Sequence, residues 1–388
     1  MEHVTIFDTT LRDGEQAPGA SMDLKGKLAL AEQLERLRVD VIEAGFPASS
    51  PADLEMVREV ARLVKDCRVA ALARARREDV EAAAAAVRLA RAPRIHVFIA
   101  TSAIHIEHKL RTTPQQVLEA TDAAVRQARN ACDDVQWSSE DCTRTDYEFM
   151  CRTFETAIRA GARTVTIADT VGYTTPDELK RRIRHLYDHV SGMDRVTLAI
   201  HCHDDLGMAT ANSLAGLEAG AREVQCTVNG IGERAGNASL EEIVMAIVTR
   251  PDLLPFELRV NTHELLPTSR LVSRITGFPV PPNKAVVGAN AFAHESGIHQ
   301  HGVLQSPVTY EIIRPEVVGA VSSEIVIGRH SGRHGLQSRL LELGLRLSES
   351  EVVEVLLRLK ADLRERKSVT NDDIHQIAQT VISERTSV

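Results

Sequence analysis

The sequence predicts an α/β protein built on a closed (β/α)8 TIM barrel, followed by a small and mostly helical C-terminal region. Three observations support this prediction. Short β-branched or apolar runs recur along the first 230 residues or so, stretches rich in Ala, Leu, Glu and Arg lie between them, and each unit takes roughly 25 to 40 residues. Strands that alternate with helices indicate a parallel sheet, and eight such units favour its closure into a barrel.

The expected strands are short apolar or β-branched segments. They are Val4–Phe7, Val39–Ala44, Val69–Ala73, Ile95–Ala100, Asp134–Ser138, Thr164–Ala168, Thr197–Ile200 and Glu223–Val228. Helices are expected between them, for example Leu24–Leu37, Val80–Arg91, Pro114–Arg129, Pro176–His189 and Ala209–Gly220. The alternative is an open dinucleotide-binding sheet, but no G-x-G-x-x-G motif follows the first strand.

The pattern changes after the barrel. Between Leu253 and Lys284, prolines interrupt the periodicity, and we interpret this stretch as the exit from the barrel. Residues 285–328 follow, and they include the Gly- and His-bearing segment Phe292–Gly302. This segment is too polar and irregular for a core element, so we expect it to be a loop.

Helices are expected again near the C-terminus. Ser348 to Glu351 has the form of a capping box before a helix over Val352–Leu363, and Thr370 is the expected N-cap of a last helix over about Asp372–Ser383. We therefore expect a catalytic barrel over 1–270, a linker and subdomain over 271–330 that contributes to a partner's active site, and a helical subdomain over 331–388.

Composition excludes several classes of protein. The net charge of -8 and the pI near 6.0 argue against a nucleic-acid-binding surface. The N-terminal segment Met1–Asp8 has neither a basic start nor an apolar stretch of signal length, and no segment of the chain approaches a membrane span. The six cysteines form no C-x-x-C pair, as expected of reduced thiols. We expect a cytoplasmic protein without nucleic-acid or membrane partners.

A pair of histidines ends the seventh expected strand. Alternate side chains of a strand share a face, so His201 and His203 point the same way while Cys202 points to the other side. Imidazole suits divalent transition metals, and an open site needs an oxygen ligand from elsewhere. An isolated H-x-H motif is weak evidence, because histidines at a barrel rim are often satisfied by ordinary hydrogen bonds.

Position in the barrel strengthens this interpretation, because the active site of a barrel lies at the carboxyl ends of its strands. Unusual polar segments follow five of the expected strands: Asp8–Glu15, Glu140–Asp141, Asp169–Thr170, His201–Asp205 and Asn229–Asn237. Among them, Asp13, His201, His203 and Asn237 form a mixed oxygen and nitrogen set that suits one divalent ion and leaves positions open for substrate.

Other rim residues have candidate roles in chemistry. Arg12 can stabilise negative charge on a carbonyl oxygen, Glu140 can serve as an acid, a base or an orienting group, and Thr170 offers a hydroxyl to a carboxylate. The loop Gly230–Gly236 can present backbone amides to an anion, although such glycines more often permit a tight turn. Three histidines farther along suggest a second metal, but their irregular spacing favours separate roles: His294, His299 and His301.

These motifs carry a resemblance to a known family. They are Asp8–Gln16, His201–Asn212 and Gly230–Asn237, and they resemble the signatures of the 2-isopropylmalate synthase, homocitrate synthase and citramalate synthase family. The resemblance runs from residue 4 to about 335. Within the family, the chain is most similar to the 2-isopropylmalate synthases through Gly45–Ser50, His96–Ser102, Lys109–Arg111, Val171–Thr174 and Phe292–Gln300.

The resemblance implies a metal-dependent Claisen condensation of acetyl-CoA with a 2-oxo acid, 2-oxoisovalerate being favoured, followed by thioester hydrolysis that releases CoA. The divalent ion, Mg, Mn, Zn or Co, would be held by the four-residue set above and would chelate the oxo acid. Arg12 would steady the developing alkoxide or enolate, Glu140 would organise the site, and Thr170 would bind the oxo-acid carboxylate. His96 and Gly236 are the other expected substrate contacts.

The resemblance also implies a shared active site. His299 and Tyr310 match family residues that reach into the barrel mouth of the neighbouring subunit, where they serve proton transfer around acetyl-CoA. The expected assembly is an obligate homodimer. A metal-binding protein without turnover is the non-enzymatic alternative, and the intact Arg12, Glu140, His299 and Tyr310 argue against it.

The chain departs from its family in places that bear on the acceptor. His301 stands where an acidic residue is usual, Ala168 stands where isopropylmalate synthases tend to carry proline, and Trp137 and Cys142 flank Glu140. We expect these changes to lie near the pocket that chooses the oxo acid. Homocitrate formation, or the use of another oxo acid in a specialised pathway, is therefore the runner-up.

Two features of the C-terminal part distinguish further alternatives. Related hydroxymethylglutaryl-CoA lyases place a catalytic cysteine in a loop after strand eight, whereas this chain has no cysteine after Cys226, so a lyase is less expected. Isopropylmalate synthases continue into a leucine-sensing domain, whereas this sequence ends at Val388. Leucine inhibition through that domain is therefore not expected.

Overall fold

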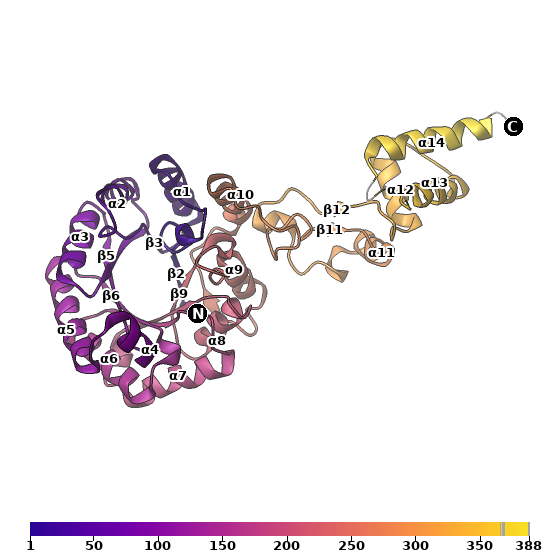
Figure 1. The fold of residues 1–388 in the computed structure, drawn as a ribbon. Helices are drawn as coiled ribbons and strands as arrows, with labels where there is room; N and C mark the ends of the chain where they lie inside the picture. The colour runs from indigo at the N-terminus through magenta and orange to yellow at the C-terminus, as the bar shows by residue number, and fades with distance from the viewer. Residues whose placement is uncertain (365, 367–368, 387–388) are drawn as a thin grey trace. The chain divides into compact units, whose positions relative to one another are not determined.

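The protein is represented by a computed structural model that describes residues 1–364, 366 and 369–386. It divides into two compact units, Met1–Val280 and Pro281–Val388. In the first unit the strands β2 to β9 close into a parallel barrel, which appears as a ring in Figure 1. The predicted fold class is confirmed.

The barrel strands lie within two residues of the expected boundaries. They are β2 (Thr5–Asp8), β3 (Val41–Glu43), β4 (Arg68–Arg74), β5 (Pro93–Ala100), β6 (Val135–Glu140), β7 (Thr164–Asp169), β8 (Thr197–Cys202) and β9 (Glu223–Cys226). Each strand pairs with its neighbours in sequence, and β2 closes the ring by pairing with β9. Every residue of β7 is buried, because a parallel barrel is covered on both faces.

Helices surround the barrel. They are α1 (Leu24–Leu37), α2 (Pro51–Leu63), α3 (Arg77–Val87), α4 (Ala103–His105), α5 (Pro114–Ala131), α6 (Tyr147–Ala160), α7 (Pro176–His189), α8 (Ala209–Glu218), α9 (Leu240–Thr249) and α10 (Leu265–Thr276). Their starts follow local chemistry: Asp23 caps α1, Ser50 caps α2, and Thr113 forms a capping box with Gln116 at α5.

The exit from the barrel is more regular than its prolines suggest. The segment that we expected to be irregular contains α10, which packs against α1. Pro267 lies in the first turn of this helix, where a backbone N–H needs no intrahelical partner, so it does not interrupt the helix. Just before it, the short strand β10 (Phe256–Glu257) pairs with β1 (Glu2–His3).

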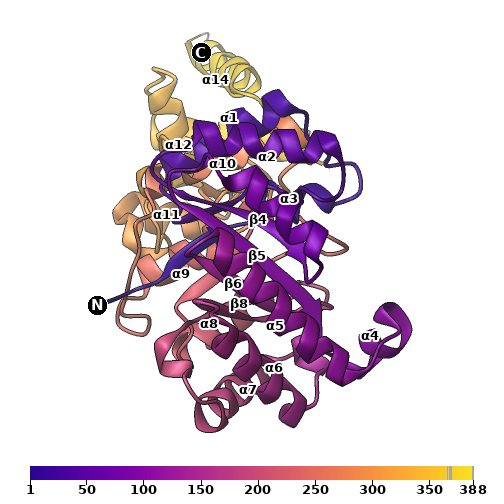
Figure 2. The ribbon, with the colours of Figure 1, turned by 90° about the vertical axis from the view of Figure 1, so that its left-hand side faces the viewer.

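The carboxyl ends of the barrel strands lie at the end where the candidate site is expected. Figure 2 shows α4, which directly follows β5, standing out beyond the ends of the strands. A π-helical turn, η2 (Ile106–Leu110), continues it and ends at Arg111 with a left-handed φ of 52°. Irregular helical turns of this kind are frequent at functional sites.

The second unit contains a small core of its own. Its elements are β11 (Ala293–His294), β12 (Glu324–Ile325), α11 (Gly297–Gln305), α12 (Arg333–Glu342), α13 (Glu349–Asp362) and α14 (Asn371–Thr386). The capping box of Ser348 and Glu351 is present, and the Asp373 N–H donates to Thr370 Oγ1 as expected of an N-cap. Leu336, Leu340, Val355 and Leu359 pack together in the core.

The expectation that Phe292–Gly302 is a loop is wrong, because β11 and the start of α11 lie in it. A buried polar side chain explains how such a segment becomes regular. Gln300 Nε2 donates to the carbonyl oxygens of His294 and Val326, each at 2.9 Å. The amide thus satisfies backbone groups in a place where an apolar side chain cannot. The expected division of this unit at residue 330 stays a prediction.

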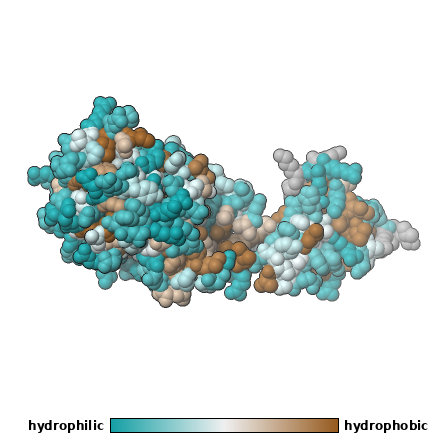
Figure 3. All heavy atoms as spheres, turned by 90° about the horizontal axis from the view of Figure 1, so that it is seen from below, coloured by the Kyte–Doolittle hydropathy of each residue, from teal (hydrophilic) through white to brown (hydrophobic). Residues whose placement is uncertain are grey.

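The visible surface is mostly hydrophilic. Figure 3 shows brown, hydrophobic areas on the barrel unit and on the second unit, among a largely teal surface. Exposed apolar side chains of the second unit include Ile298, Val308, Ile312 and Val321. Within the part of the chain that the structure describes, no helix is both long enough and apolar enough to cross a membrane.

Candidate metal centre and active site

The predicted metal pair lies at the carboxyl end of β8. His201 belongs to the strand, and His203 follows it and forms an isolated bridge with Asn237. Both imidazoles line one central cavity, as strand alternation predicts. Cys202 between them is buried, and burial raises the pKa of its thiol, so it is an inert neighbour of the site.

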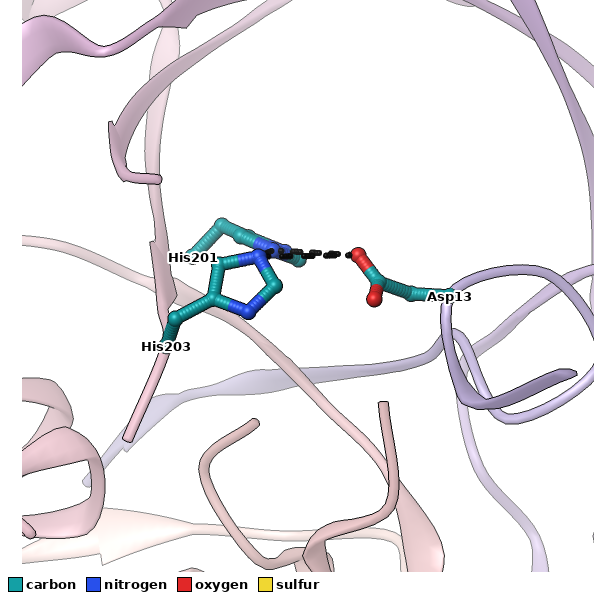
Figure 4. A group of neighbouring side chains, drawn as sticks. All are labelled: Asp13, His201 and His203. Atoms are coloured by element: carbon teal, nitrogen blue, oxygen red, sulfur yellow. Dashed lines mark hydrogen bonds and ion pairs between the residues drawn. The ribbon is translucent and has the colours of Figure 1, made fainter. Parts of the chain in front are cut away.

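Asp13 joins the two histidines. It follows β2 and is 3% exposed, and each histidine is 6% exposed. Asp13 Oδ2 lies 3.4 Å from His201 Nε2 and 3.8 Å from His203 Nε2, and the two nitrogens lie 3.1 Å apart. Figure 4 shows the three side chains pointing toward one another. Their ligand atoms could therefore hold one metal ion.

Asn237 supplies a fourth candidate ligand. Its Nδ2 donates to Asp13 Oδ1 and to the carbonyl oxygen of Ile231, each at 3.1 Å. Its Oδ1 is buried and has no hydrogen-bond partner among the described residues. Such an unpaired buried acceptor is uncommon, and a divalent cation beside Asp13 would satisfy it. The donor set fits the expected metal.

Burial and neighbouring charges shift the pKa values of these ligands. Burial raises the pKa of Asp13, but the Arg12 guanidinium and the two histidines outweigh it and hold this pKa well below its ordinary value. Burial, with a contribution from His201, lowers the pKa of His203 to about 4. At neutral pH, Asp13 is ionised and His203 is neutral, and these are the forms that bind a metal.

Glu43 is a site residue that we did not predict. It ends β3, is fully buried, and accepts from Arg12 Nε and Thr9 Oγ1, each at 2.6 Å. Its other oxygen lies 2.6 Å from His96 Nδ1, and His96 Nε2 lies 2.6 Å from Ser138 Oγ. A buried carboxylate at a strand end was the available signal, because such a group needs partners.

Arg12 occupies the centre of this network. Its Nη1 lies 2.7 Å from Asp13 Oδ2 while its Nε binds Glu43, so both carboxylates orient the guanidinium. Although burial raises the pKa of Glu43, Arg12 and His96 lower it to about 2. The arrangement holds Arg12 beside the metal ligands, as its predicted role requires.

The cavity is about 280 Å³ and is lined by both polar and apolar side chains. Its predicted members are Arg12, Asp13, His96, Glu140, Thr170, His201 and His203. Its apolar wall, which we did not predict apart from Ala168, is formed by Phe46, Leu72, Phe98 and Ala168. A small anion with an apolar tail fits such a cavity.

Thr170 is held in a donor role. The backbone N–H of Asp141 donates to Thr170 Oγ1 at 2.8 Å, which leaves the hydroxyl hydrogen available to a carboxylate. Arg234 Nη2 donates to the carbonyl oxygen of Thr170 at 2.7 Å and also pairs with Asp205, so three rim loops are joined. Gly236 is not among the described residues that line the cavity, and its backbone N–H donates within the loop to the carbonyl oxygen of Glu233 at 2.9 Å.

Glu140 lies at the rim of the cavity. It ends β6 and forms an ion pair with Lys109 of η2, which also lines the cavity. His105 Nδ1 lies 3.7 Å from Glu140 Oε1. The carboxylate is therefore surrounded by cationic or potentially cationic groups, which suits an orienting role.

The departures from the family fall in different places. Ala168 lines the cavity as expected. Trp137 is fully buried and its ring lies edge-on to Phe154 of α6, with 5.3 Å between centroids, so it packs between barrel and helix. Cys142 is also fully buried, and neither of these two is among the described residues that line the cavity.

The remaining predicted residues lie in the second unit. The rings of His299 and Tyr310 stack with 4.2 Å between their centroids. His294 Nε2 lies 3.0 Å from Glu311 Oε1. The ring of His301, the remaining departure from the family, lies 4.5 Å from that of His334 between centroids.

Comparison with known proteins gives a consistent result. Residues 3–272 match the HMGL-like family, and residues 286–367 match the homocitrate synthase post-HMGL domain-like family. The chain is 54% identical over 382 residues to a 2-isopropylmalate synthase of Carboxydothermus hydrogenoformans, which covers 98% of this chain and 75% of that protein. It is 52% identical to the 2-isopropylmalate synthase of Pyrococcus furiosus, and that alignment covers 97% of this chain and 75% of that protein.

Solved structures match the barrel. A hydroxymethylglutaryl-CoA lyase of Bacillus subtilis superposes with a TM-score of 0.63 at 21% identity, covering 72% of this chain and 96% of the lyase. The lyase of Brucella melitensis gives a TM-score of 0.61 at 23% identity, and the match covers 71% of this chain and 100% of the lyase. At such identities the likeness concerns the fold.

Proposed function

The chain belongs to the 2-isopropylmalate synthase family within the HMGL-like proteins, and on this premise we propose that it condenses acetyl-CoA with a 2-oxo acid and releases CoA. The observation that carries this proposal is the cavity in which Asp13, His201 and His203 converge beside Arg12. One wall of the cavity offers metal ligands and cationic donors, and another is apolar.

The residues of the cavity have separate roles in this reaction. A divalent metal held by Asp13, His201, His203 and Asn237 would supply Lewis acidity toward the oxo acid. Arg12, fixed by Glu43, stabilises the negative charge that develops on the acceptor oxygen. Thr170 donates its hydroxyl hydrogen to the substrate carboxylate, and Glu140 orients groups at the rim.

The apolar wall favours 2-oxoisovalerate as the acceptor. Leu72, Phe98 and Ala168 offer aliphatic and aromatic surface to an isopropyl group. The cations of the cavity already have carboxylate partners: Lys109 pairs with Glu140, and Arg234 pairs with Asp205. A second substrate carboxylate would have to displace one of these pairs.

The test is an acceptor screen. Purified protein with Mg, Mn, Zn or Co is assayed for thiol release from acetyl-CoA with 2-oxoisovalerate, 2-oxoglutarate, pyruvate and bulkier 2-oxo acids. We expect the highest kcat/KM with 2-oxoisovalerate. A clear preference for another acid would reassign the substrate, and no release with any acid would reject the condensation itself.

A homocitrate-type acceptor is the second candidate. The match of residues 286–367 to a homocitrate synthase domain supports it, and Ala168 leaves more room in the cavity than a larger residue. The 2-oxoglutarate arm of the screen decides between the two. A lyase reaction is disfavoured, because the last cysteine of the chain, Cys226, is buried in β9 and burial raises its pKa well above the ordinary value.

We propose further that the enzyme is a homodimer in which His299 and Tyr310 serve the barrel of the partner subunit. Imidazole and phenol groups can both take part in proton transfer, and the rings of these two residues are stacked on an exposed part of the second unit. We also propose a cytoplasmic location, in keeping with six free cysteines.

A further inference from the structure

Gln225 lies next to the metal ligands and has no role in the function described so far. It belongs to β9, where its backbone pairs with that of His201 on β8. The side chain is 1% exposed and lines the central cavity. A buried amide needs hydrogen-bond partners for both its oxygen and its nitrogen, because burial without them is unfavourable.

The carbonyl oxygen of Gln225 determines the state of His201. Gln225 Oε1 lies 3.0 Å from His201 Nδ1, and because a carbonyl oxygen only accepts, the imidazole nitrogen must donate. The lone pair of His201 is then on Nε2, which faces His203 Nε2 at 3.1 Å and Asp13 Oδ2 at 3.4 Å. This is the tautomer that binds a metal through Nε2.

The two histidines differ in this respect. His203 Nδ1 is buried and has no hydrogen-bond partner among the described residues. Only the backbone of His203 is held locally, by its isolated bridge to Asn237. Gln225 is therefore the side chain that orients one of the two ligands, and His201 depends on it more than His203 depends on any comparable group.

The amide nitrogen of Gln225 has a different status. Gln225 Nε2 is buried and has no hydrogen-bond partner among the described residues, although it carries two N–H donors. Leaving a buried donor unpaired is unfavourable, so a partner that arrives with the substrate would be stabilised there. Because the residue lines the cavity, an oxygen atom of a bound substrate can accept from it.

We propose that Gln225 has two functions: its Oε1 positions His201 as a metal ligand, and its Nε2 donates a hydrogen bond to an oxygen of the bound 2-oxo acid. The second function rests on the proposed condensation, whereas the first requires only the metal site. The two functions belong to different atoms, so two substitutions can separate them.

The experiment uses the full chain. Gln225→Leu removes both the acceptor and the donor, and Gln225→Glu keeps an acceptor toward His201 but removes the donor. Mn²⁺ affinity is measured by electron paramagnetic resonance of free Mn²⁺, and 2-oxoisovalerate affinity by calorimetry on the Mn²⁺-loaded protein. Circular dichroism checks the fold of each variant. If Gln225→Leu does not fold, Gln225→Met, which also lacks an acceptor oxygen, replaces it.

We expect Gln225→Leu to weaken Mn²⁺ binding about 10- to 100-fold, the usual effect of losing a partner of a metal-bound histidine. Gln225→Glu should bind Mn²⁺ within a few-fold of wild type but bind the oxo acid at least about 10-fold more weakly, because a hydrogen bond is lost and a negative charge faces an anion. Wild-type Mn²⁺ affinity in the leucine or methionine variant would overturn the positioning function. Unchanged oxo-acid affinity in the glutamate variant would overturn the donor function.

A matched control separates these effects from general damage to the barrel. Gln136 is also a fully buried barrel glutamine, but its amide binds Thr166 and Glu223. Gln136→Leu should lower the melting temperature without changing the Mn²⁺ affinity of the folded protein. Because Mn²⁺ binding needs no turnover, failure of the acceptor screen would leave the positioning result intact.

Discussion

Two groups of titratable side chains differ sharply in how they are held. The rim cluster, formed by Arg12, Asp13, Glu43, His201 and His203, is almost completely buried, and its members bind one another. The tail cluster of the second unit, formed by His294, His299, His301, Tyr310 and His334, is more open: Tyr310 is 43% exposed.

The difference in burial between the two clusters indicates which of them is preorganised for catalysis. Barrel strands fix the rim cluster in a medium where charges interact strongly and pKa values shift. The tail cluster lies on short elements, and the rings of His299 and Tyr310 stack on an exposed surface. We infer that the rim cluster is preorganised within one chain, whereas the tail cluster acquires its function only when another surface covers it.

The largest effect is expected in the rim cluster. His203→Ala removes a metal ligand, so turnover should fall by at least about 1000-fold and the metal should be lost, while the fold remains. Metal content, thiol release and circular dichroism check this outcome. His189→Ala, at the end of α7, is the control and should behave like wild type. Undiminished turnover of His203→Ala would remove the metal-site assignment.

The tail cluster is tested by mixing two inactive variants. His299→Ala should lose about 100-fold or more of activity if it transfers protons. When it is mixed with His203→Ala and the subunits are allowed to exchange, a shared site predicts recovery, because one barrel of each mixed dimer is then complete. The measurement is thiol release before and after exchange.

An absence of recovery in demonstrated mixed dimers would show that each site is built within one chain. His334→Ala is the control in the same cluster. Its ring contacts His301 and it is exposed, so its activity should stay within about two-fold of wild type.

A smaller effect is expected when the support of the rim cluster is removed. Glu43→Gln breaks a buried pair with Arg12, and it should cost about 3 kcal/mol of stability and lower kcat more than it raises KM. The folded pKa of Glu43 is lowered to about 2 from 4.5, so its stabilisation is complete above pH 4.5 and is lost as the pH falls toward 2.

Chemical denaturation between pH 5 and pH 2 measures this contribution. Wild type should lose stability steeply across that window, and Glu43→Gln should have a flatter dependence. Parallel curves for the two proteins would show that Glu43 contributes no pH-dependent stability. Glu55→Gln on the exposed face of α2 is the control.

The smallest effect concerns the cavity wall. Ala168→Val adds two methyl groups beside the acceptor, so kcat/KM for 2-oxoisovalerate should fall about 10-fold relative to pyruvate. The acceptor assay measures this ratio, and an unchanged ratio would place the acyl chain elsewhere in the cavity. Trp137→Phe, which changes the packing against α6, should leave the ratio unchanged.

Much of the fold could be predicted from the sequence because periodicity is a local signal. The eight strands and the helix over residues 24–37 lie where their patterns place them. The errors have local causes as well. Pro267 lies within α10, where the first turn tolerates it, and Gln300 uses its amide to build a regular segment that we expected to be a loop.

The candidate site was predictable in part. The motifs indicated a metal site because their residue types bind metals: Asp13, His201, His203 and Asn237. These residues follow or end barrel strands, and the carboxyl ends of barrel strands meet at one rim, so the sequence also predicted that they lie together. Glu43 and Gln225 carry no motif of their own. Their importance comes from partners distant in sequence, and Trp137 was placed near the pocket although it faces a helix.

The sequence by itself determined the period of the strands, the chemical types at their ends and the family. Only the tertiary structure decided which of these groups touch. Closure of the barrel brings Asp13, which follows the first barrel strand, against Asn237 in the loop after the last barrel strand, and it places the Gln225 amide beside His201. The physical reason is that hydrogen bonding and pKa shifts depend on distances and burial, which strand pairing across the whole chain sets.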